Sequence, residues 1–366
     1  MKKENLIKDS KRIVIKIGSS LLIDKSKGSL KSEWLGSLAQ DINKLIKQKK
    51  EIIIVSSGSI ALGQKQLKLK GNLSLDEKQA AAATGQVSLA HAWKEVMEKF
   101  GLNIAQILLA PDDTEKRRKH LNARATLLKL LELQVIPVIN ENDTVSTEEI
   151  RFGDNDRLAA RVAQIIGADT LIILTDVDGL YDKSKKIVKF VDKIDEKIIS
   201  LVEKDKNLYG SGGISTKLDA ARICMNSGCH MFISNGKKDN PIKRMLKTKI
   251  FTHFKPKISS LDAKKKWIIS SLSSSGVIYV DDGAAKALSN GKSLLAAGII
   301  KITGSFKKGE NVLIVNRSGN HLARGLASFN SLEIDKIKGK QSREIEKVLG
   351  YLSKSEVIHK DNMVKL

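Results

Sequence analysis

The sequence predicts an α/β protein in which a mainly parallel sheet is sandwiched by helices, followed by a small β-barrel-like domain. Over roughly the first 250 residues, apolar runs of strand length alternate with segments of helical spacing, which is typical of a parallel sheet covered on both faces. Several of these runs end in polar or glycine-rich turns, where open α/β sheets bind their ligands. From about Lys255 on, short β-rich pieces separated by glycines replace the alternation.

The predicted elements follow the apolar periodicity along the chain. Spacing such as that of Leu35, Leu38 and Ile42 predicts helices, and Thr114 is a possible N-cap of one of them. We expect strands at 11–17, 52–55, 104–109, 135–139, 170–174, 231–234 and 250–251, a small hairpin in 185–194, helices at 32–49, 77–100, 114–133, 154–166 and 216–227, and C-terminal strands at 277–280, 299–302, 311–315 and 322–328.

The first strand contains a lysine, Lys16, in an otherwise apolar run that ends in the turn Gly18-Ser19-Ser20. A buried lysine costs free energy unless it is paired or faces a ligand, so Lys16 is a candidate for contact with an anion. The alternative is a lysine at the edge of the strand that extends its ammonium group into solvent.

The second strand ends in a similar turn, with the sequence SSGS at 56–59. Serine hydroxyls and backbone N–H groups after a strand can donate to an anion, although ordinary turns use the same residues. The helix at 77–100 contains the small-residue stretch AAAATGQ, which permits close packing against a neighbouring element.

The segment 140–160 is acidic although the protein is basic. It contains six carboxylates and two arginines, whereas the formal net charge of the chain is +23. Because it follows a predicted strand of the sheet, it favours a site for a cationic group, a metal–phosphate, or both; a solvated loop is the alternative. Asp154 or Asn155 is expected to cap the helix that begins there.

The loop 209–217 has the sequence YGSGGISTK and leads into a predicted helix. Its glycines let the backbone approach a phosphate, its hydroxyls can donate, and Lys217 can reach the negative charge. The spacing is not that of a Walker A loop, and a turn that caps the helix is the alternative.

Composition argues against several classes of protein. The chain has 366 residues, no run of 18 apolar residues, and only two cysteines, Cys224 and Cys229, which we expect to be buried thiols. The N-terminus lacks the apolar segment of a secretory signal, so we expect a cytoplasmic protein with no membrane partner. There are 49 basic and 32 acidic residues before Gly276 and 15 and 9 from there on. Charge spread so evenly does not mark a nucleic-acid-binding domain.

Taken together, the motifs resemble the glutamate 5-kinases of the amino acid kinase superfamily. The matching pieces are VIKIGSS, VSSGSIALG, NARATL, PVINENDTV, FGDNDRLAA, TDVDGLY and GGISTK, and the C-terminal pieces VDDGAAKAL, GKSLLAAGI and GSFKKGE look like a PUA domain. Two departures keep the functional groups: Ser211 stands where many relatives have threonine, and Ser19 stands where many have threonine after the first lysine.

The resemblance implies the amino acid kinase fold and a division into domains. We expect a kinase domain with the ATP and glutamate sites at 1–256, a linker at 257–275, a PUA-like domain at 276–356 and a tail at 357–366. It also implies ATP-dependent phosphorylation of the L-glutamate γ-carboxylate to L-glutamyl 5-phosphate, the first step of proline biosynthesis, with Mg²⁺. Feedback inhibition by proline, a homo-oligomer of two or four chains, and RNA binding through the PUA-like domain are further expectations.

The resemblance also gives the candidate residues their roles. Lys16 and Lys217 would stabilise the transferring phosphoryl group, and Ser57, Asp143 and Asn155 would bind glutamate, with Asp154 and Asp156 as second choices. No metal ligand is named, because Mg²⁺ keeps several waters and few protein ligands. The expected ATP-binding residues are Lys16, Thr175, Asp176, Ser211, Gly212, Gly213, Ile214, Ser215, Thr216 and Lys217.

Two other functions compete with this interpretation. One keeps the fold and changes the acceptor to another carboxylate, carbamate or phosphate; an N-acylated acceptor would have no ammonium group for Asp143 to bind. The other is an RNA-binding protein, which the basic composition and the PUA-like segment favour. Against it, the C-terminal part is no more basic than the rest and shows no obvious cluster of exposed aromatic residues.

Overall fold

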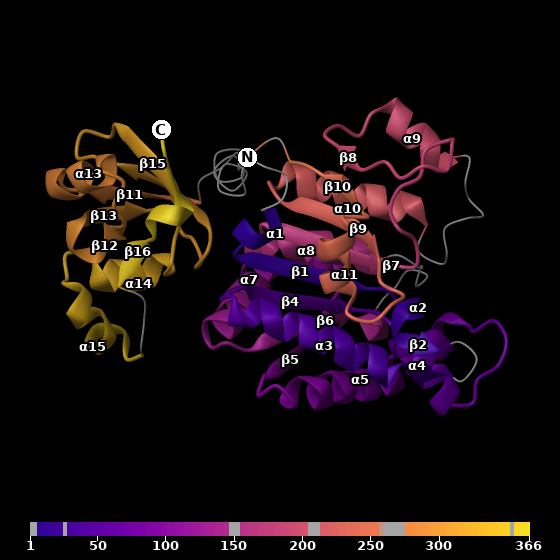
Figure 1. Ribbon diagram of the computed structural model, residues 1–366. Coiled ribbons are helices and arrows are strands. Elements are labelled where there is room, and N and C mark those ends of the chain that lie inside the picture. The colour runs from indigo at the N-terminus through magenta and orange to yellow at the C-terminus, as the bar shows by residue number, and fades with distance from the viewer. Residues whose placement is uncertain are drawn as a thin grey trace. The chain divides into compact units, whose positions relative to one another are not determined.

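The computed structural model describes residues 6–24, 28–145, 154–203, 213–256, 258, 275–351 and 355–366. The chain divides into two compact units, Met1–Ser260 and Leu261–Leu366 (Figure 1), and the described residues form separate hydrophobic cores in each. None of the helices in these ranges is both long and apolar enough to cross a membrane.

The first unit is built on a sheet with β1 (Arg12–Ile17) near its middle. β1 pairs in parallel with β4 (Glu51–Ser56) on one side and with β7 (Thr170–Thr175) on the other. The order of the described strands is β5-β6-β4-β1-β7-β9-β10-β8, with β5 at Ile104–Leu109, β6 at Ile136–Glu141, β8 at Phe190–Val191, β9 at His230–Asn235 and β10 at Thr252–Phe254. β10 is antiparallel to β9, and β8 is parallel to β10, while the other pairs are parallel. The predicted mainly parallel sheet is confirmed.

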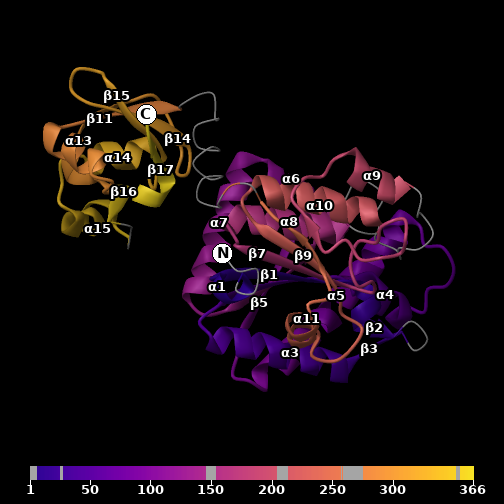
Figure 2. The same ribbon diagram turned by 45° about the horizontal axis from the view of Figure 1, so that its top comes forward.

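Helices cover both faces of this sheet (Figures 1 and 2). Ile13, Ile15 and Ile17 belong to the core shared with α3 (Ser32–Lys47), α5 (Leu75–Glu98) and α11 (Pro241–Thr248). Val14 belongs to the core shared with α7 (Arg117–Glu132), α8 (Asp154–Ile166) and α10 (Ile214–Asn226). Because side chains alternate along a strand, Lys16 lies on the same face as Val14, toward α8 and α10.

The helix predicted at 114–133 is divided in two. α6 (Pro111–Glu115) and α7 are separated at Lys116, whose backbone is extended at φ −71° and ψ 117°. Thr114 lies inside α6, where its hydroxyl donates to the Pro111 carbonyl over 2.8 Å, so its assignment as an N-cap was wrong. Pro111 at the start of α6 explains the earlier beginning, since proline favours the first helical turn.

The edge of the sheet also differs from the sequence prediction. Within 185–194, Ile187 forms one antiparallel bridge to the earlier residue Tyr181. The strand β8 follows and joins the main sheet. The expected hairpin was therefore largely wrong. The last strand of this sheet along the chain lies at 252–254 and not at 250–251. Apolar composition alone did not locate its ends.

α4 (Ser59–Gln66) and α5 pack unusually closely. A Cβ atom on Gly63 would lie 1.8 Å from the Ala81 carbonyl oxygen, and one on Gly85 would lie 1.9 Å from the Ser59 carbonyl oxygen. The small-residue stretch of α5 therefore does permit close packing, as predicted. Its consequence is that Gln86 on α5 lies beside the start of α4.

The second unit contains a mixed sheet in the order β13-β11-β14-β15-β17 and a two-stranded ladder of β12 and β16, as far as the structure describes it. The four strands predicted there are confirmed with small shifts of their ends. They and their partners are β11 (Gly276–Val280), β12 (Leu294–Leu295), β13 (Ile299–Thr303), β14 (Asn311–Val315), β15 (His321–Leu326), β16 (Glu356–Ile358) and β17 (Met363–Lys365), with helices α13 (Asp282–Ser289), α14 (Ser331–Ile337) and α15 (Ile345–Leu349).

Short elements complete the description. They are α1 (Leu6–Asp9), α2 (Ser19–Leu22), β2 (Ile23–Asp24), β3 (Ser29–Leu30), α9 (Glu196–Glu203) and the 3₁₀ turns at Asp143–Val145, Ala296–Gly298, Ser342–Glu344 and Lys360–Asn362. Cys224 and Cys229 are free and buried, as expected, and burial raises the pKa of the Cys229 thiol well above its ordinary value.

Candidate active site

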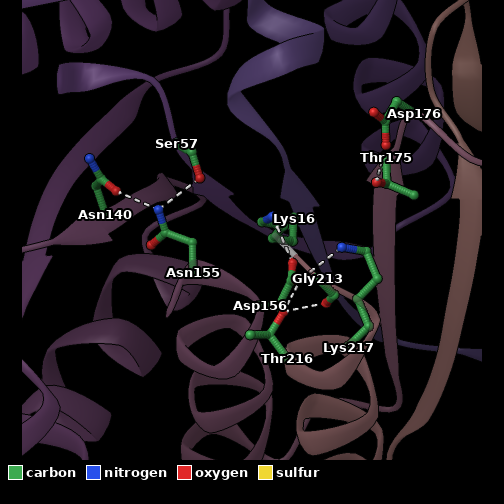
Figure 3. Close-up of polar contacts among 10 residues, drawn as sticks. All are labelled: Lys16, Ser57, Asn140, Asn155, Asp156, Thr175, Asp176, Gly213, Thr216 and Lys217. Carbon is green, nitrogen blue, oxygen red and sulfur yellow. Dashed lines mark hydrogen bonds and ion pairs between the residues drawn. The ribbon is translucent and has the colours of Figure 1, made fainter. Parts of the chain in front are cut away.

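A buried aspartate holds two lysines together where β1 meets α8 and α10. The Lys16 ammonium lies 2.6 Å from Oδ1 of Asp156, and the Lys217 ammonium lies 3.1 Å from Oδ2 (Figure 3). Both lysines are 6% exposed and Asp156 is not exposed at all. Lys16 is therefore not a solvated strand-edge lysine but a buried, paired one.

The electrostatics of this group leave it positive. Burial by itself raises the pKa of Asp156, but the charges and hydrogen bonds of Lys16 and Lys217 outweigh burial and hold the pKa below its ordinary value. The aspartate is therefore ionised at neutral pH, and it balances one of the two ammonium charges. The group retains one net positive charge in a nearly dry environment, where charge acts more strongly than in water.

The start of α10 is held against the same aspartate. The Thr216 hydroxyl lies 2.8 Å from the Gly213 carbonyl and 3.3 Å from Oδ2 of Asp156. Ile214 is buried, whereas Ser215 is exposed. A glycine that precedes a helix leaves backbone N–H groups available to an anion. Ser211 and Gly212, which were also predicted to bind ATP, lie outside the described residues.

A second group, made of neutral amides and hydroxyls, forms around Asn155, the residue before Asp156 at the start of α8. Nδ2 of Asn155 donates to Oγ of Ser57 over 2.7 Å and to Oδ1 of Asn140 over 3.0 Å (Figure 3). Nδ2 of Asn140 in turn donates to Oγ of Ser59 over 3.1 Å and to Oε1 of Gln86 over 2.9 Å. Oδ1 of Asn155 is buried and has no hydrogen-bond partner among the described residues.

The remaining predicted residues follow β6, end or follow β7, or begin α8, and β6 and β7 are separated in the sheet by β4 and β1. Asp143 is buried in the 3₁₀ turn Asp143–Val145, which follows β6 and packs against α5. Thr175 ends β7, and its hydroxyl lies 3.1 Å from Oδ1 of Asp176. Asp154 begins α8, but its side chain lies outside the described part of the structure, as do residues 146–153 before it.

The structure thus separates the sequence-predicted residues into two groups. Lys16, Lys217 and Thr216 meet at Asp156, which the sequence suggested only as a second choice for the amino acid. Ser57 and Asn155 meet in the amide group. Thr175 and Asp176 form a separate pair, which lies apart from both groups in Figure 3.

Sequence reasoning missed three members of the amide group: Ser59, Gln86 and Asn140. Each lies within one of the motifs described above, namely SSGS, AAAATGQ and the first position of the acidic segment. Nothing in their local sequence distinguished them. They come from α4, α5 and β6, and only the fold brings them within hydrogen-bonding distance.

No metal site can be assigned from the described side chains. No group of three or more His, Cys, Asp or Glu residues among them is arranged to hold a metal ion. The positive charge beside Asp156 instead suits a phosphate group, which is the chemistry expected of Lys16 and Lys217.

Comparison with known proteins covers both units. Residues 11–235 match the model of the amino acid kinase family, and residues 276–349 match that of the PUA domain. The chain is 53% identical over 367 residues to a glutamate 5-kinase of Pelagibacter ubique (strain HTCC1062), and the matched region covers 98% of this chain and 100% of that protein. It is 46% identical over 361 residues to a glutamate 5-kinase of Paramagnetospirillum magneticum (strain ATCC 700264 / AMB-1), and the matched region covers 97% of this chain and 98% of that protein. Among solved structures, a carbamate kinase from Giardia lamblia bound to AMP-PNP matches with a TM-score of 0.48 and 18% identity, covering 68% of this chain and 99% of that one.

Proposed function

The chain belongs to the amino acid kinase family, and we propose how its two side-chain groups carry out the reaction of its relatives. That reaction is the ATP-dependent phosphorylation of the L-glutamate γ-carboxylate to L-glutamyl 5-phosphate, the first step of proline biosynthesis. The pair of buried lysines on one buried aspartate is the observation that carries the mechanism.

The Asp156 group would act on the transferring phosphoryl group. An oxygen of the γ-carboxylate attacks the γ-phosphorus of ATP, a new P–O bond forms, the bond to the β-phosphate oxygen breaks, and ADP leaves. Lys16 and Lys217 would stabilise the charge on the phosphoryl oxygens during this step, which needs positioning and charge more than covalent catalysis. No general base is required, because a glutamate γ-carboxylate is already ionised at neutral pH.

Asp156 would act by positioning both lysines and not as a contact for the amino acid. Each of its oxygens faces an ammonium group of the protein, which supports the positioning role. Asp154 stays a second choice for that contact.

ATP would lie across the ends of β7 and α10. We assign its contacts to Lys16, Thr175, Asp176 and the loop Ser211, Gly212, Gly213, Ile214, Ser215, Thr216 and Lys217. The position of this loop supports the assignment, because the Thr216 hydroxyl at the start of α10 contacts both the Gly213 carbonyl and Asp156. Mg²⁺ would enter mainly with the nucleotide and would offset charge on the β- and γ-phosphates.

Glutamate would bind at the amide group. Ser57 and Asn155 meet there, and the free oxygen of Asn155 suits a donor such as the α-ammonium group. Asp143 would supply the opposite charge for that ammonium. This preference for a free amino group distinguishes glutamate from N-acylated acceptors.

A hydroxylamine trapping assay tests this function directly, because hydroxylamine converts an acyl phosphate into a stable hydroxamate. Product should form with ATP and glutamate together and with neither alone. Equal or greater product with aspartate or N-acetylglutamate, or hydroxyurea formed from carbamate at an equal or greater rate, would overturn the choice of substrate. Product formed only with one of these acceptors would keep the kinase chemistry.

The second unit supports a second, separate proposal. Its match to the PUA domain suggests that it binds structured RNA. The affinity of the protein for RNA should then fall as the salt concentration rises. A shift in the electrophoretic mobility of a structured RNA that is lost when the protein is truncated before residue 276 would support this proposal. The absence of any mobility shift at low salt would exclude it.

We propose domain limits of 1–256, 257–275, 276–356 and 357–366. The boundary between the two compact units, at Ser260, lies within the proposed linker.

Three further expectations from the sequence analysis are carried forward as proposals and need solution measurements. They are inhibition by proline, assembly into dimers or tetramers, and a cytoplasmic location. Proline titration of the hydroxamate assay tests the first, light scattering after size-exclusion chromatography tests the second, and cell fractionation tests the third.

A further inference from the structure

The three amide side chains of the second group form a chain of hydrogen bonds with one direction. Oε1 of Gln86 accepts from Nδ2 of Asn140, and Oδ1 of Asn140 accepts from Nδ2 of Asn155. The other N–H of Asn140 goes to Ser59, and the other N–H of Asn155 goes to Ser57. Gln86 and Asn140 are buried, at 7% and 2% exposure.

This direction determines what Asn155 presents to a ligand. A carboxamide has two N–H donors and one oxygen acceptor. Both donors of Asn155 are used inside the group, so its oxygen is left over, buried and without a partner among the described residues. A buried acceptor of this kind costs free energy until a donor reaches it.

The opposite direction would remove that unpartnered oxygen. If the amides of Asn140 and Asn155 were both turned over, the hydroxyls of Ser59 and Ser57 could donate to their oxygens, because a hydroxyl both donates and accepts. Asn155 would then present N–H groups, which repel an ammonium group. Gln86 in its present orientation opposes this arrangement, because the turned amide of Asn140 would place an oxygen against Oε1 of Gln86.

We propose that Gln86 is a positioning residue for substrate choice: through Asn140 it fixes the direction of the Asn155 amide, so that the pocket accepts a hydrogen bond from the substrate's free amino group. The inference rests on the proposed function, since it concerns the amino-acid site of that reaction. Gln86 itself touches no reacting atom in this account.

Two substitutions at Gln86 separate hydrogen bonding from packing. Gln86→Met keeps the size and removes the acceptor, whereas Gln86→Glu keeps an acceptor oxygen whether it is ionised or protonated. Gln66→Met is a matched control, since Gln66 is an exposed glutamine on α4 whose side chain donates to Ser88 and, among the described residues, has no bond to the amide group. Thermal melting of each variant checks that it is folded, and Gln86→Ala replaces Gln86→Met if the latter is not.

The measurements are the KM values for glutamate and ATP, and the kcat/KM ratio of glutamate to glutarate, which lacks the amino group. Gln86→Met should raise the glutamate KM about tenfold, as expected when one hydrogen bond to a charged group is lost, with the ATP KM unchanged. The preference over glutarate should fall by a similar factor. Gln86→Glu should stay within about twofold of the wild type on all three.

Each other result has a definite meaning. An unchanged glutamate KM in Gln86→Met overturns the inference alone, and so does a Gln86→Glu variant as impaired as Gln86→Met, because packing would then explain both. An equal rise in the ATP KM would also overturn it. A wild type that forms no glutamyl hydroxamate would overturn the proposed function, and this inference with it.

Discussion

The two groups of side chains that form around Asn155 and Asp156 differ in charge, although both residues lie at the start of α8. Asn155 and Asp156 are consecutive, so their side chains point about 100° apart around the helix. Asp156 meets two ammonium groups and leaves the site positive, whereas Asn155 meets only neutral amides and hydroxyls. The charged group suits a phosphate, and the neutral group suits an amino acid.

The difference shows how one helix can keep two binding functions separate. Charge acts over a distance, so the lysines need to be close to the transferring group but not in one unique orientation. Hydrogen bonds of amides depend on direction, so the neutral group can discriminate between substrates of similar charge. Substitutions in the two groups should therefore affect different kinetic constants.

The largest effect should come from the lysines. Lys16→Ala or Lys217→Ala should lower kcat by about 10²–10³-fold or more, because each removes a charged donor aimed at the transition state. The glutamate KM should change much less. Stopped assays of hydroxamate formation at saturating substrates measure kcat, and circular dichroism checks the fold. Near-normal turnover in either variant would remove that lysine from the mechanism.

Asp156→Asn should come next. The amide cannot hold both ammonium groups, so kcat should fall by about 10²-fold as the lysines lose their positions. Because two buried lysines would lose their counter-charge, the free energy of unfolding at pH 7 should also fall, by about 3–5 kcal/mol. Urea unfolding followed by fluorescence measures this. A variant with normal stability and kcat would show that the lysines are held by other means.

Asp143→Asn should chiefly weaken glutamate binding. Loss of the charged partner of the ammonium group should raise the glutamate KM about 10–100-fold, with a smaller change in kcat and none in the ATP KM. Initial rates over a matrix of both substrates separate these constants. An unchanged glutamate KM would count against this pocket and would make the two groups less distinct than we propose.

Gly85→Ala should disturb the amide group through the backbone. The new Cβ would lie 1.9 Å from the Ser59 carbonyl oxygen, so α4 must move. We expect a loss of about 1–3 kcal/mol in the free energy of unfolding and a few-fold rise in the glutamate KM. Gly36→Ala is the control, since Gly36 on α3 has open space around it, and it should be neutral or slightly stabilising. Equal behaviour of the two variants would argue that α4 and α5 can separate freely.

The smallest effect concerns pH. The pKa of Asp156 lies below its ordinary value of 3.8, so its ionised form stabilises the fold fully above pH 3.8, and this contribution is lost as the pH falls from 3.8 through the folded pKa. The difference in unfolding free energy between wild type and Asp156→Asn should therefore be constant from pH 7 to about 4.5 and shrink in more acidic buffer. A difference that shrinks already near pH 6 would mean that another group titrates.

Much of the fold could be predicted from local patterns. Strands such as β5, at Ile104–Leu109, and helices such as α8, at Asp154–Ile166, were predicted with their ends in place. Long periodic segments specify their own structure through burial of one face or both. The errors lie at Lys116, which divides a helix, and at the sheet edge near Phe190, where short segments take their structure from their partners.

The sequence by itself determined the fold class, the two units, and the candidate residues that a resemblance could mark, with Lys16, Lys217, Ser57 and Asn155 among them. It did not determine that Asp156 holds the lysines, nor that Gln86 and Asn140 orient Asn155. Those contacts join β1 to α8 and α10, and α5 to β6 and α8, across many intervening residues. The tertiary structure decided them, because periodicity reports which face of an element is buried, whereas a hydrogen bond depends on which side chains from distant segments meet there.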